Sequence, residues 1–289
     1  MLRVEHLEKK FKDFAIRDIS FQLEPGYIMG LIGRNGAGKT TLMRMLLGVY
    51  KIDRGSVSIN GWDLVHNTVK AKDEIGFILD QTPFLEELTI AENQKLFSRF
   101  YSRWDDELFD FYLRRFHISE HRLVMDLSKG IQTKLQLAFA LAHHPRLLIM
   151  DEPTGGLDPI FRKEFLMLLQ ELLEKEEMSI LISTHLTNDL DQIADYITMI
   201  DDGKLLFSKS KEELLDECYI VKGAIEDEKA LLGDANAIIV HKKGRFEAFI
   251  QDRELADKLL AITEIPVVLE HATLEDIMYY RTRRGLDEN

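Results

Sequence analysis

Residues 33–40 read GRNGAGKT, and this stretch decides the fold. It matches the phosphate-loop pattern G-x-x-x-x-G-K-[ST] at every fixed position. A run typical of a buried strand, YIMGLI at 27–32, precedes it, and a helical pattern, TTLMRMLLG at 40–48, follows it. A strand, a glycine-rich turn and a helix in this order predict an α/β fold with a parallel sheet and a site for a nucleotide.

The residue types in this loop suit a triphosphate. Its glycines let backbone N–H groups point at phosphate oxygens. Lys39 adds a point charge between the outer phosphates, the Thr40 hydroxyl suits Mg²⁺, and Thr41 is placed to reach the α-phosphate. The residues predicted to hold ATP and Mg²⁺ here are Gly33, Arg34, Asn35, Gly36, Ala37, Gly38, Lys39, Thr40 and Thr41.

Two apolar runs later in the chain end in polar side chains. Residues 146–153 read RLLIMDEP, and residues 179–184 read SILIST and lead to His185. Such runs are typical of strands buried in a parallel sheet, and ligands bind at the carboxyl ends of these strands. We expect Asp151 to serve the metal, Glu152 to act as the base for an attacking water, and His185 to donate to the γ-phosphate.

A second anion-binding turn lies at 126–145, which read DLSKGIQTKLQLAFALAHHP. The apolar spacing from Ile131 onward predicts a helix. The residues Ser128 to Gly130 then lie at its N-terminus, a position that favours anions. One nucleotide does not need two such loops unless the chain folds back on itself. The other possibility is that the second loop serves a nucleotide held by another copy.

Composition limits the class of protein. The chain has 289 residues, with 37 Lys and Arg against 50 Asp and Glu, a net charge of −13. This acidic balance argues against a nucleic-acid partner. A single cysteine, Cys218, allows no internal disulfide, which fits a reducing cytoplasm. The charged start is not typical of a secretory signal, and no apolar run approaches the ~20 residues of a membrane span. A role at a membrane would therefore need the span of another chain.

The pattern along the chain predicts two domains. Short strands fill residues 1–80, and mostly helical patterns rich in aromatic residues fill residues 85–145. We expect a nucleotide-binding domain over 1–208, with a helical subdomain at about 85–145. After residue 208 the pattern of strands and helices changes. Residues 216–289 are predicted to form a small C-terminal α/β domain with an accessory or regulatory role.

Five motifs stand in an order that resembles the ATP-binding-cassette (ABC) ATPases over about residues 1–208. They are GRNGAGKT at 33–40, LSKG at 127–130, LLIMDEP at 147–153, GGLDP at 155–159 and STH at 183–185. The resemblance implies a P-loop NTPase core with a parallel sheet, an antiparallel β-subdomain and a helical subdomain. It also implies ATP hydrolysis with Mg²⁺.

In that family two subunits face each other head-to-tail, and the signature turn of one, here residues 127–130, closes on the nucleotide of the other. The resemblance implies that Ser128 and Gly130 contact the partner's nucleotide, and that Asp158 links the two sites. It also implies an aromatic ring near the N-terminus that stacks on adenine. We expect Phe11 in this role, with Phe14 as the alternative.

The sequence departs from the family pattern at three places, of which the mildest is a phenylalanine instead of the commoner tyrosine as the adenine-stacking residue. Lys129 replaces the first glycine of the signature turn, and Ile131 replaces its glutamine. A loop near residue 80 usually carries a glutamine that senses the γ-phosphate. Asp80 aligns with the position of this glutamine, whereas Gln81, the next residue, has the amide side chain. Both residues therefore stay candidates for contact with the nucleotide. Gln81 is also a candidate ligand of Mg²⁺. An aspartate there would add negative charge near the metal and slow turnover.

Three segments resemble exporters whose ATPase and permease are separate chains, such as bacterial systems for antimicrobial peptides, lantibiotics and bacitracin. They are TPFLEELTIAEN at 82–93, the LSKG turn, and ATLEDIMYYRTRRG at 272–285. The resemblance implies two partners: a transmembrane permease and a second ATPase subunit, identical or paralogous. It implies a cytoplasmic protein held at the inner face of the cell membrane by the permease. The aromatic region 84–116 would receive a permease helix.

Two alternatives explain less of the sequence. A non-transport ABC ATPase acting on ribosomes or DNA usually carries two cassettes or a long coiled coil, and the net charge of −13 disfavours such partners. A small-molecule kinase would use the phosphate loop but would not need residues 127–130 or His185.

Overall fold

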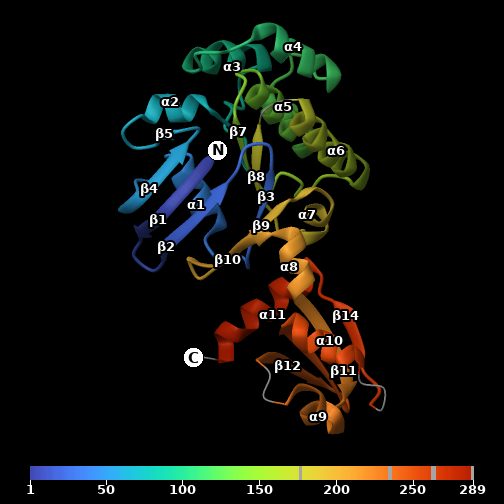
Figure 1. Ribbon diagram of the computed structural model, residues 1–289. Coiled ribbons are helices and arrows are strands. Elements are labelled where there is room, and N and C mark those ends of the chain that lie inside the picture. The colour runs from blue at the N-terminus through green and yellow to red at the C-terminus, as the bar shows by residue number, and fades with distance from the viewer. Residues whose placement is uncertain (176–177, 234–235, 262–264, 288–289) are drawn as a thin grey trace.

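The computed structural model describes residues 1–175, 178–233, 236–261 and 265–287. The strands of these residues form two sheets, which lie in an upper and a lower part of the molecule in Figure 1. The large sheet has the order β5-β4-β1-β2-β10-β9-β3-β8-β7-β6, and the small one the order β12-β13-β11-β14.

The large sheet is mixed. Its strands are β1 (Leu2–Lys10), β2 (Ala15–Leu23), β3 (Ile28–Ile32), β4 (Arg54–Ile59), β5 (Trp62–Asp63), β6 (Ile75–Ile78), β7 (Leu147–Asp151), β8 (Ser179–Ser183), β9 (Tyr196–Asp201) and β10 (Lys204–Ser210). From β9 through β3, β8 and β7 to β6 the neighbours are parallel, whereas β1 is antiparallel to both β2 and β4. The carboxyl ends of β3, β7 and β8 therefore share one edge, where ligands bind in open α/β sheets.

Helices cover the sheet and extend its upper end (Figure 1). They are α1 (Lys39–Leu46), α2 (Thr68–Asp73), α3 (Ile90–Phe97), α4 (Asp106–Arg115), α5 (Lys129–Leu141), α6 (Pro159–Lys175) and α7 (Thr187–Ile193), with short 3-10 turns at η1 (Ser98–Phe100) and η2 (Val124–Asp126). The predicted fold class is confirmed: a parallel core, an antiparallel part around β1 and a helical part between β6 and β7.

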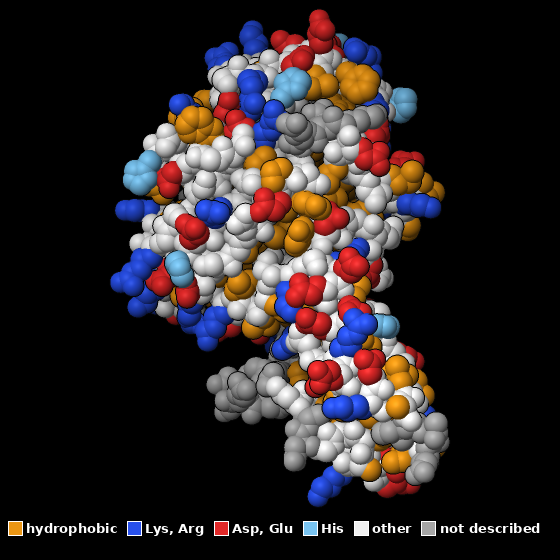
Figure 2. All heavy atoms as spheres, viewed as in Figure 1, with side chains coloured by type: hydrophobic (Ala, Val, Ile, Leu, Met, Phe, Trp, Pro, Cys, Tyr) orange, Lys and Arg blue, Asp and Glu red, His pale blue; other side chains and the backbone are white. Residues whose placement is uncertain are grey.

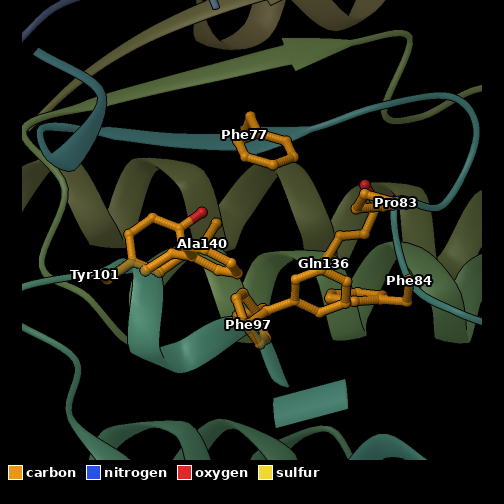
Figure 3. Close-up of a pocket in the computed structure, with 9 residues that line it drawn as sticks. Phe77, Pro83, Phe84, Phe97, Tyr101, Gln136 and Ala140 are labelled. Atoms are coloured by element: carbon orange, nitrogen blue, oxygen red, sulfur yellow. The ribbon is translucent and has the colours of Figure 1, made fainter. Parts of the chain in front are cut away.

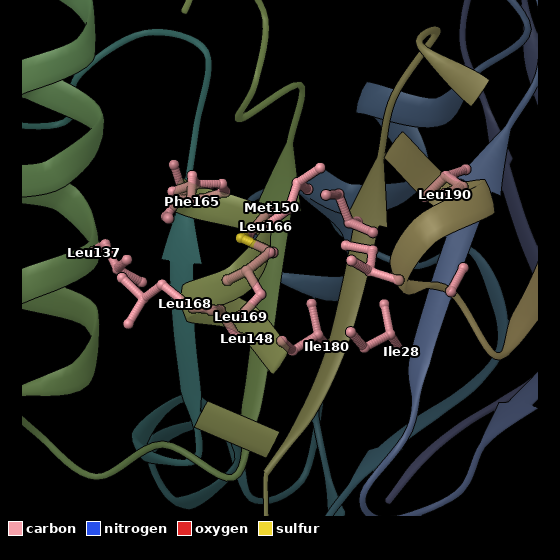
Figure 4. Packing of buried hydrophobic residues seen from close by; sticks show 14 of the residues in the cluster. Ile28, Leu137, Leu148, Met150, Phe165, Leu166, Leu168, Leu169, Ile180 and Leu190 are labelled. Carbon is pink, nitrogen blue, oxygen red and sulfur yellow. The ribbon is translucent and has the colours of Figure 1, made fainter. Parts of the chain in front are cut away.

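The parallel strands form because their side chains are apolar on both faces. Every residue of β3, β7 and β8 is buried. Figure 4 shows Leu169 of α6 beside Leu148 of β7 and Ile180 of β8, and these three and Phe165 of α6 belong to one buried cluster. Burial of each such side chain contributes on the order of 2 kcal/mol, so this core fixes the strand ends that carry the polar residues.

The first helix of the helical part, α3, begins with a capping box. The Thr89 hydroxyl accepts from the Glu92 backbone N–H at 3.2 Å, and the Glu92 carboxylate accepts from the Thr89 N–H at 2.8 Å. This reciprocal capping box satisfies N–H groups at the start of α3. The Asp105 carboxylate caps α4 by accepting from the Leu108 N–H at 2.9 Å.

The small sheet begins at Cys218 and carries its own helices. The elements after β10 are α8 (Lys211–Glu217), β11 (Cys218–Ala224), η3 (Ile225–Asp227), α9 (Glu228–Leu232), β12 (Ala237–Lys242), β13 (Arg245–Gln251), α10 (Arg253–Ala261), β14 (Val268–His271) and α11 (Leu274–Asp287). Residues Leu214, Ile277 and Tyr280 join a buried cluster that also includes strands of the large sheet, whereas Tyr219 and Val221 of β11 belong to a separate cluster. Figure 2 shows acidic and basic side chains interspersed on the face of the molecule that is in view. The end of the predicted C-terminal domain, 288–289, lies outside the described residues.

A histidine is buried between α5 and the start of β6. The His143 side chain is 1% exposed, its Nε2–H donates to the Ile75 carbonyl oxygen at 3.0 Å, and its ring stacks on Tyr101 with centroids 4.0 Å apart. Burial disfavours the imidazolium and lowers the pKa of His143 to about 4. The unfolded chain protonates this histidine near its ordinary pKa of about 6.5, whereas the folded chain does not.

The stability contributed by neutral His143 is therefore complete above pH 6.5 and is lost as the pH falls toward 4. We expect the free energy of unfolding to drop by up to about 3 kcal/mol over this range because of this one group. Urea unfolding at a series of pH values measures the drop. The His143→Gln variant keeps a donor for Ile75 but does not titrate, so its stability should fall less steeply. Equal slopes for the two proteins would contradict this account.

Candidate ATP site

The phosphate loop turns the chain from β3 into α1 at the carboxyl edge of the sheet. Gly36 and Gly38 have φ of 83° and 107°, a left-handed conformation that glycine adopts without strain. A Cβ at Gly38 would also lie 2.7 Å from Cζ of Phe14. The loop ends at Lys39, the first residue of α1, so the helix directs its unpaired N–H groups at this site. This arrangement suits phosphate oxygens.

Lys39 is held at the centre of the loop. Its buried ammonium donates to the carbonyl oxygen of Gly33 at 2.7 Å and to that of Arg34 at 3.2 Å. Burial lowers the pKa of Lys39, while the nearby carboxylates of Glu152 and Asp151 act in the opposite direction. A dianionic phosphate here would favour the charged ammonium, which is the form that binds it.

Aromatic rings form one wall of a pocket of about 600 Å³ beside the loop. Phe11 packs edge-on against Tyr50 with centroids 5.4 Å apart, and Phe14 lies 6.4 Å from Phe11. The structure thus brings both predicted adenine-stacking candidates to the site and adds Tyr50, which sequence reasoning missed. The pocket is lined by Phe11, Phe14, Asn35, Gly36, Gly38, Lys39, Thr40, Thr41, Tyr50 and Glu152. An apolar wall beside a phosphate loop suits a nucleotide with its base on the rings.

The two predicted catalytic side chains meet at the ends of neighbouring strands. Asp151 of β7 pairs in register with Ser183 of β8, and the Ser183 hydroxyl donates to the buried Asp151 carboxylate at 2.5 Å. Glu152 follows with φ of 51°, a strained value for a non-glycine residue, and its N–H donates to the Ser183 carbonyl at 3.0 Å. This turn places the Glu152 Oε2 atom 2.7 Å from Nδ1 of His185.

The donors at the start of α1 and the end of β7 fit a magnesium ion. Mg²⁺ takes one or two protein oxygens and completes its shell with phosphate oxygens and water. Thr40 offers an exposed hydroxyl in the pocket, and Asp151 offers a carboxylate at the strand end. Gln81 is exposed and does not line this pocket in the described part of the chain, so its metal role stays a prediction.

Asp80 pairs with Lys129 in this structure, and its contact with the nucleotide stays a prediction. Its carboxylate forms an ion pair with the ammonium of Lys129, which also donates to the Asp80 carbonyl oxygen at 2.8 Å. Asp80 does not belong to the residues that line the ATP pocket. The structure therefore joins two of the departures from the family pattern to each other.

The signature turn lies outside its own subunit's ATP pocket. Ser128 precedes α5 as its N-terminal cap residue, is exposed, and makes no side-chain bond to the helix in this structure. Gly130 is in the first turn of α5, with the ring of Phe161 beside it. Neither residue lines the pocket around Lys39. The second predicted anion-binding turn thus lies outside the nucleotide pocket of its own chain, as the described residues line it.

Asp158 caps the next helix. Its carboxylate accepts from the backbone N–H groups of Ile160 at 3.1 Å and Phe161 at 3.0 Å, at the start of α6. Asp158 is exposed, and it too lies outside the residues that line the ATP pocket. Its predicted role between two sites stays a prediction.

A buried carboxylate supports the turn between Glu152 and Asp158. Asp189 of α7 is 1% exposed, accepts from the Thr154 hydroxyl at 2.7 Å and pairs with Arg162 Nε at 2.6 Å. Because a buried charge must be paired, this network fixes the turn to α6 and α7. Sequence reasoning missed Asp189, which lies in a run of polar residues without a recognisable motif.

Comparison with known proteins agrees with this site. The ABC transporter family model matches residues 16–155. The uncharacterized ABC transporter ATP-binding protein YdbJ of Bacillus subtilis (strain 168) is 36% identical over 208 residues, 71% of this chain and 68% of that protein. The bacitracin transport ATP-binding protein BcrA of Bacillus licheniformis is 36% identical over 194 residues, 66% of this chain and 63% of that protein.

A solved structure of an ATP-binding subunit of an ABC transporter has the same fold. It is 27% identical, with a TM-score of 0.68, and the match covers 74% of this chain and 91% of that one. In the described part of this chain, no helix has the length and apolar character needed to cross a membrane. The motifs, the fold and these similarities show that the chain belongs to the ATP-binding subunits of ABC transporters, a family of ATPases that bind and hydrolyse ATP.

Proposed function

We propose that this chain hydrolyses ATP with Mg²⁺ to power export of a peptide of the antimicrobial type, in a complex with a membrane permease and a second ATPase subunit. The observation that carries the proposal is the placement of two anion-binding turns. Lys39 and Glu152 line one pocket, whereas the exposed Ser128 lies outside it. The turn that contains Ser128 can bind a nucleotide only if another chain presents it. A second copy of this chain, facing the first head-to-tail, would present the nucleotide held by its own phosphate loop.

Hydrolysis would use groups that line the pocket, such as Lys39, Thr40 and Glu152, together with Asp151 and His185 at the neighbouring strand ends. Lys39 and the N–H groups of the loop bind the β- and γ-phosphates. Glu152 accepts a hydrogen bond from the attacking water and orients it toward phosphorus. His185, held by the Glu152 carboxylate, donates to the γ-phosphate as charge develops there. Mg²⁺, held by Thr40 and Asp151, would neutralise charge on the phosphate oxygens.

The second subunit completes each site. Ser128 and the first N–H groups of α5 would bind the γ-phosphate held by the partner, because a helix N-terminus attracts anions. Asp158 lies at the start of α6, where the ring of Phe161 is beside Gly130. A closed pair of subunits would thus place the signature turn and the turn that follows Glu152 at the same interface. Hydrolysis removes the shared ligand and reopens the pair.

An apolar groove in the helical part suits a cytoplasmic helix of the permease. Figure 3 shows aromatic rings gathered around a pocket of about 310 Å³. It is lined by Phe77, Pro83, Phe84, Phe97, Phe100, Tyr101, Gln136, Phe139 and Ala140. Most of these residues belong to region 84–116 or to the face of α5 beneath it. An amphipathic helix docks in such grooves through its apolar face, which would hold this chain at the inner face of the membrane.

The inference of a peptide cargo rests on the name of one relative. BcrA is named for bacitracin transport, and the identity of 36% extends over 194 residues, 66% of this chain. We infer a cargo of similar chemistry, a peptide with apolar groups. With the permease in vesicles, such a peptide should raise the rate of ATP hydrolysis, and a sugar of the same size should not.

Phe100 tests the permease groove. Its side chain is 73% exposed although it lines the groove, so its loss should not unfold the protein. We expect Phe100→Ser to weaken binding of the permease by at least about tenfold, the size of a central interface contact. The affinity for ATP should not change, because the groove does not include the phosphate loop. Binding is measured by co-purification from membranes that contain the permease.

The matched control is Phe111→Ser, which removes another exposed aromatic ring from α4 outside the groove. This variant should bind the permease like the native protein. If Phe100→Ser also retains native affinity, the groove is not the docking site.

A further inference from the structure

Two side chains at the edge of the signature turn form an ion pair with each other. Asp80 lies in the loop after β6, and Lys129 is the first residue of α5. The ammonium of Lys129 contacts the carboxylate of Asp80 and donates to its carbonyl oxygen at 2.8 Å. One side chain thus holds both the acid and the backbone of a loop 49 residues away. This double contact fixes the loop more firmly than a carboxylate contact alone.

The same loop is fastened to α5 at a second point. The buried amide of Gln136 accepts from the Leu79 N–H at 2.9 Å and donates to the Leu79 carbonyl oxygen at 3.1 Å. Gln136 lies seven residues after Lys129, which is two turns along the same face of the helix. Consecutive loop residues, Leu79 and Asp80, are therefore bound to one face of α5.

This face of α5 connects the apolar groove to the signature turn. Gln136 and Pro83 line the apolar groove, and Lys129 stands between Ser128 and Gly130 in the signature turn. A displacement of the loop would thus be transmitted to the turn through two contacts, one at each end of the segment. The link lies wholly within one subunit.

We propose that the Asp80–Lys129 pair is a latch that positions the signature turn for the partner's nucleotide and couples that position to the permease groove. Lys129 is a positioning residue: it sets where Ser128 and the first N–H groups of α5 point. The latch rests on the proposed function, since it acts on a site shared by two subunits. The charge of Asp80 offsets that of Lys129, so the turn presents N–H groups rather than a free ammonium.

Both side chains are partly exposed, so the pair contributes little to folding and its loss should leave the protein folded. We expect Asp80→Asn and Lys129→Gln each to lower kcat about three- to tenfold, with ATP affinity of the isolated subunit within about twofold of native. The double variant Asp80→Asn/Lys129→Gln should be no slower than the slower single variant. The conservative variant Lys129→Arg keeps a cation that can donate to both the Asp80 carboxylate and its carbonyl oxygen, so it should retain at least about half of native kcat.

A second ion pair provides the matched control. Arg115 and Glu171 join α4 and α6 at 2.7 Å and lie outside the loop, and the exposure of Arg115, 37%, is close to the 40% of Lys129. Arg115→Gln should leave kcat unchanged. The latch is overturned if the two single variants turn over ATP at the native rate, if their effects multiply in the double variant, or if Lys129→Arg is as slow as Lys129→Gln.

The same assay separates the latch from the proposed function. The proposed function is refuted if the native protein does not hydrolyse ATP and the Glu152→Gln variant forms no ATP-dependent dimer. The latch alone is refuted if the native protein hydrolyses ATP and the Glu152→Gln variant dimerises with ATP, but the effects of Asp80→Asn and Lys129→Gln are independent.

Discussion

Replacing Glu152 with glutamine is expected to lower the rate of ATP hydrolysis by a factor of about 10² to 10⁴, while ATP still binds. The carboxylate is 2.7 Å from His185 and lines the pocket beside the phosphate loop. Glutamine has the same size and can keep the contact with His185, but its amide cannot accept a proton from water. The strained backbone at this position is unaffected by the change. Catalysis should therefore be lost without loss of the site.

Release of phosphate measures the rate, and titration calorimetry with ATP measures binding. Because the variant cannot remove the γ-phosphate, its closed dimer should also elute as a long-lived species in size-exclusion chromatography. Glu164→Gln, an exposed change on α6, is the matched control and should hydrolyse ATP normally. Native hydrolysis by Glu152→Gln would show that another group orients the water.

The second large effect is expected at Lys39. Its ammonium is buried and held by the carbonyl oxygens of Gly33 and Arg34, so the loop is built around a positive charge. A charge-assisted hydrogen bond contributes about 1.5–3 kcal/mol, and its removal should weaken ATP binding on the order of tenfold to a hundredfold. Lys39→Ala should thus lose most ATP affinity and, with it, hydrolysis.

Calorimetry with ATP and Mg²⁺ measures this loss. Lys163→Ala, which removes an exposed ammonium from α6, is the control and should bind like the native protein. Circular dichroism should show that Lys39→Ala is folded. Unchanged affinity in this variant would refute the assignment of residues 33–40 as the nucleotide site.

Much of the core could be predicted because the signals are local. The apolar runs that become β3, β7 and β8 have no polar residue until their ends, and only a strand buried on both faces requires such a pattern. The position of Glu152 and His185 at one edge of the sheet followed from the rule that parallel strands end together, whereas their direct contact is a finding of the structure.

The missed features depend on contacts between distant segments. Tyr50 reaches the ATP pocket only because of the direction in which the chain leaves α1, and Asp189 is recognisable only beside Thr154. Asp80 and Lys129 stood in the sequence as two separate departures from the family pattern. Their contact depends on how α5 packs against β6, which no local periodicity determines.

The central claim is that each ATP is hydrolysed between two subunits, with Ser128 supplied by the partner. A mixture of two variants tests it. Lys39→Ala prevents the phosphate loop from binding ATP but keeps the signature turn. Ser128→Arg blocks the signature turn but keeps the phosphate loop. Each variant alone has no complete site. A mixed pair has one, because the loop of the Ser128→Arg subunit meets the native turn of the Lys39→Ala subunit.

The measurement is the rate of phosphate release by the two variants alone and in an equal mixture. Random pairing makes about half of the dimers mixed, each with one of two sites intact, so the mixture should regain up to about a quarter of native activity. A mixture as inactive as its components, or a Ser128→Arg protein that hydrolyses ATP at the native rate, would contradict a site shared between subunits.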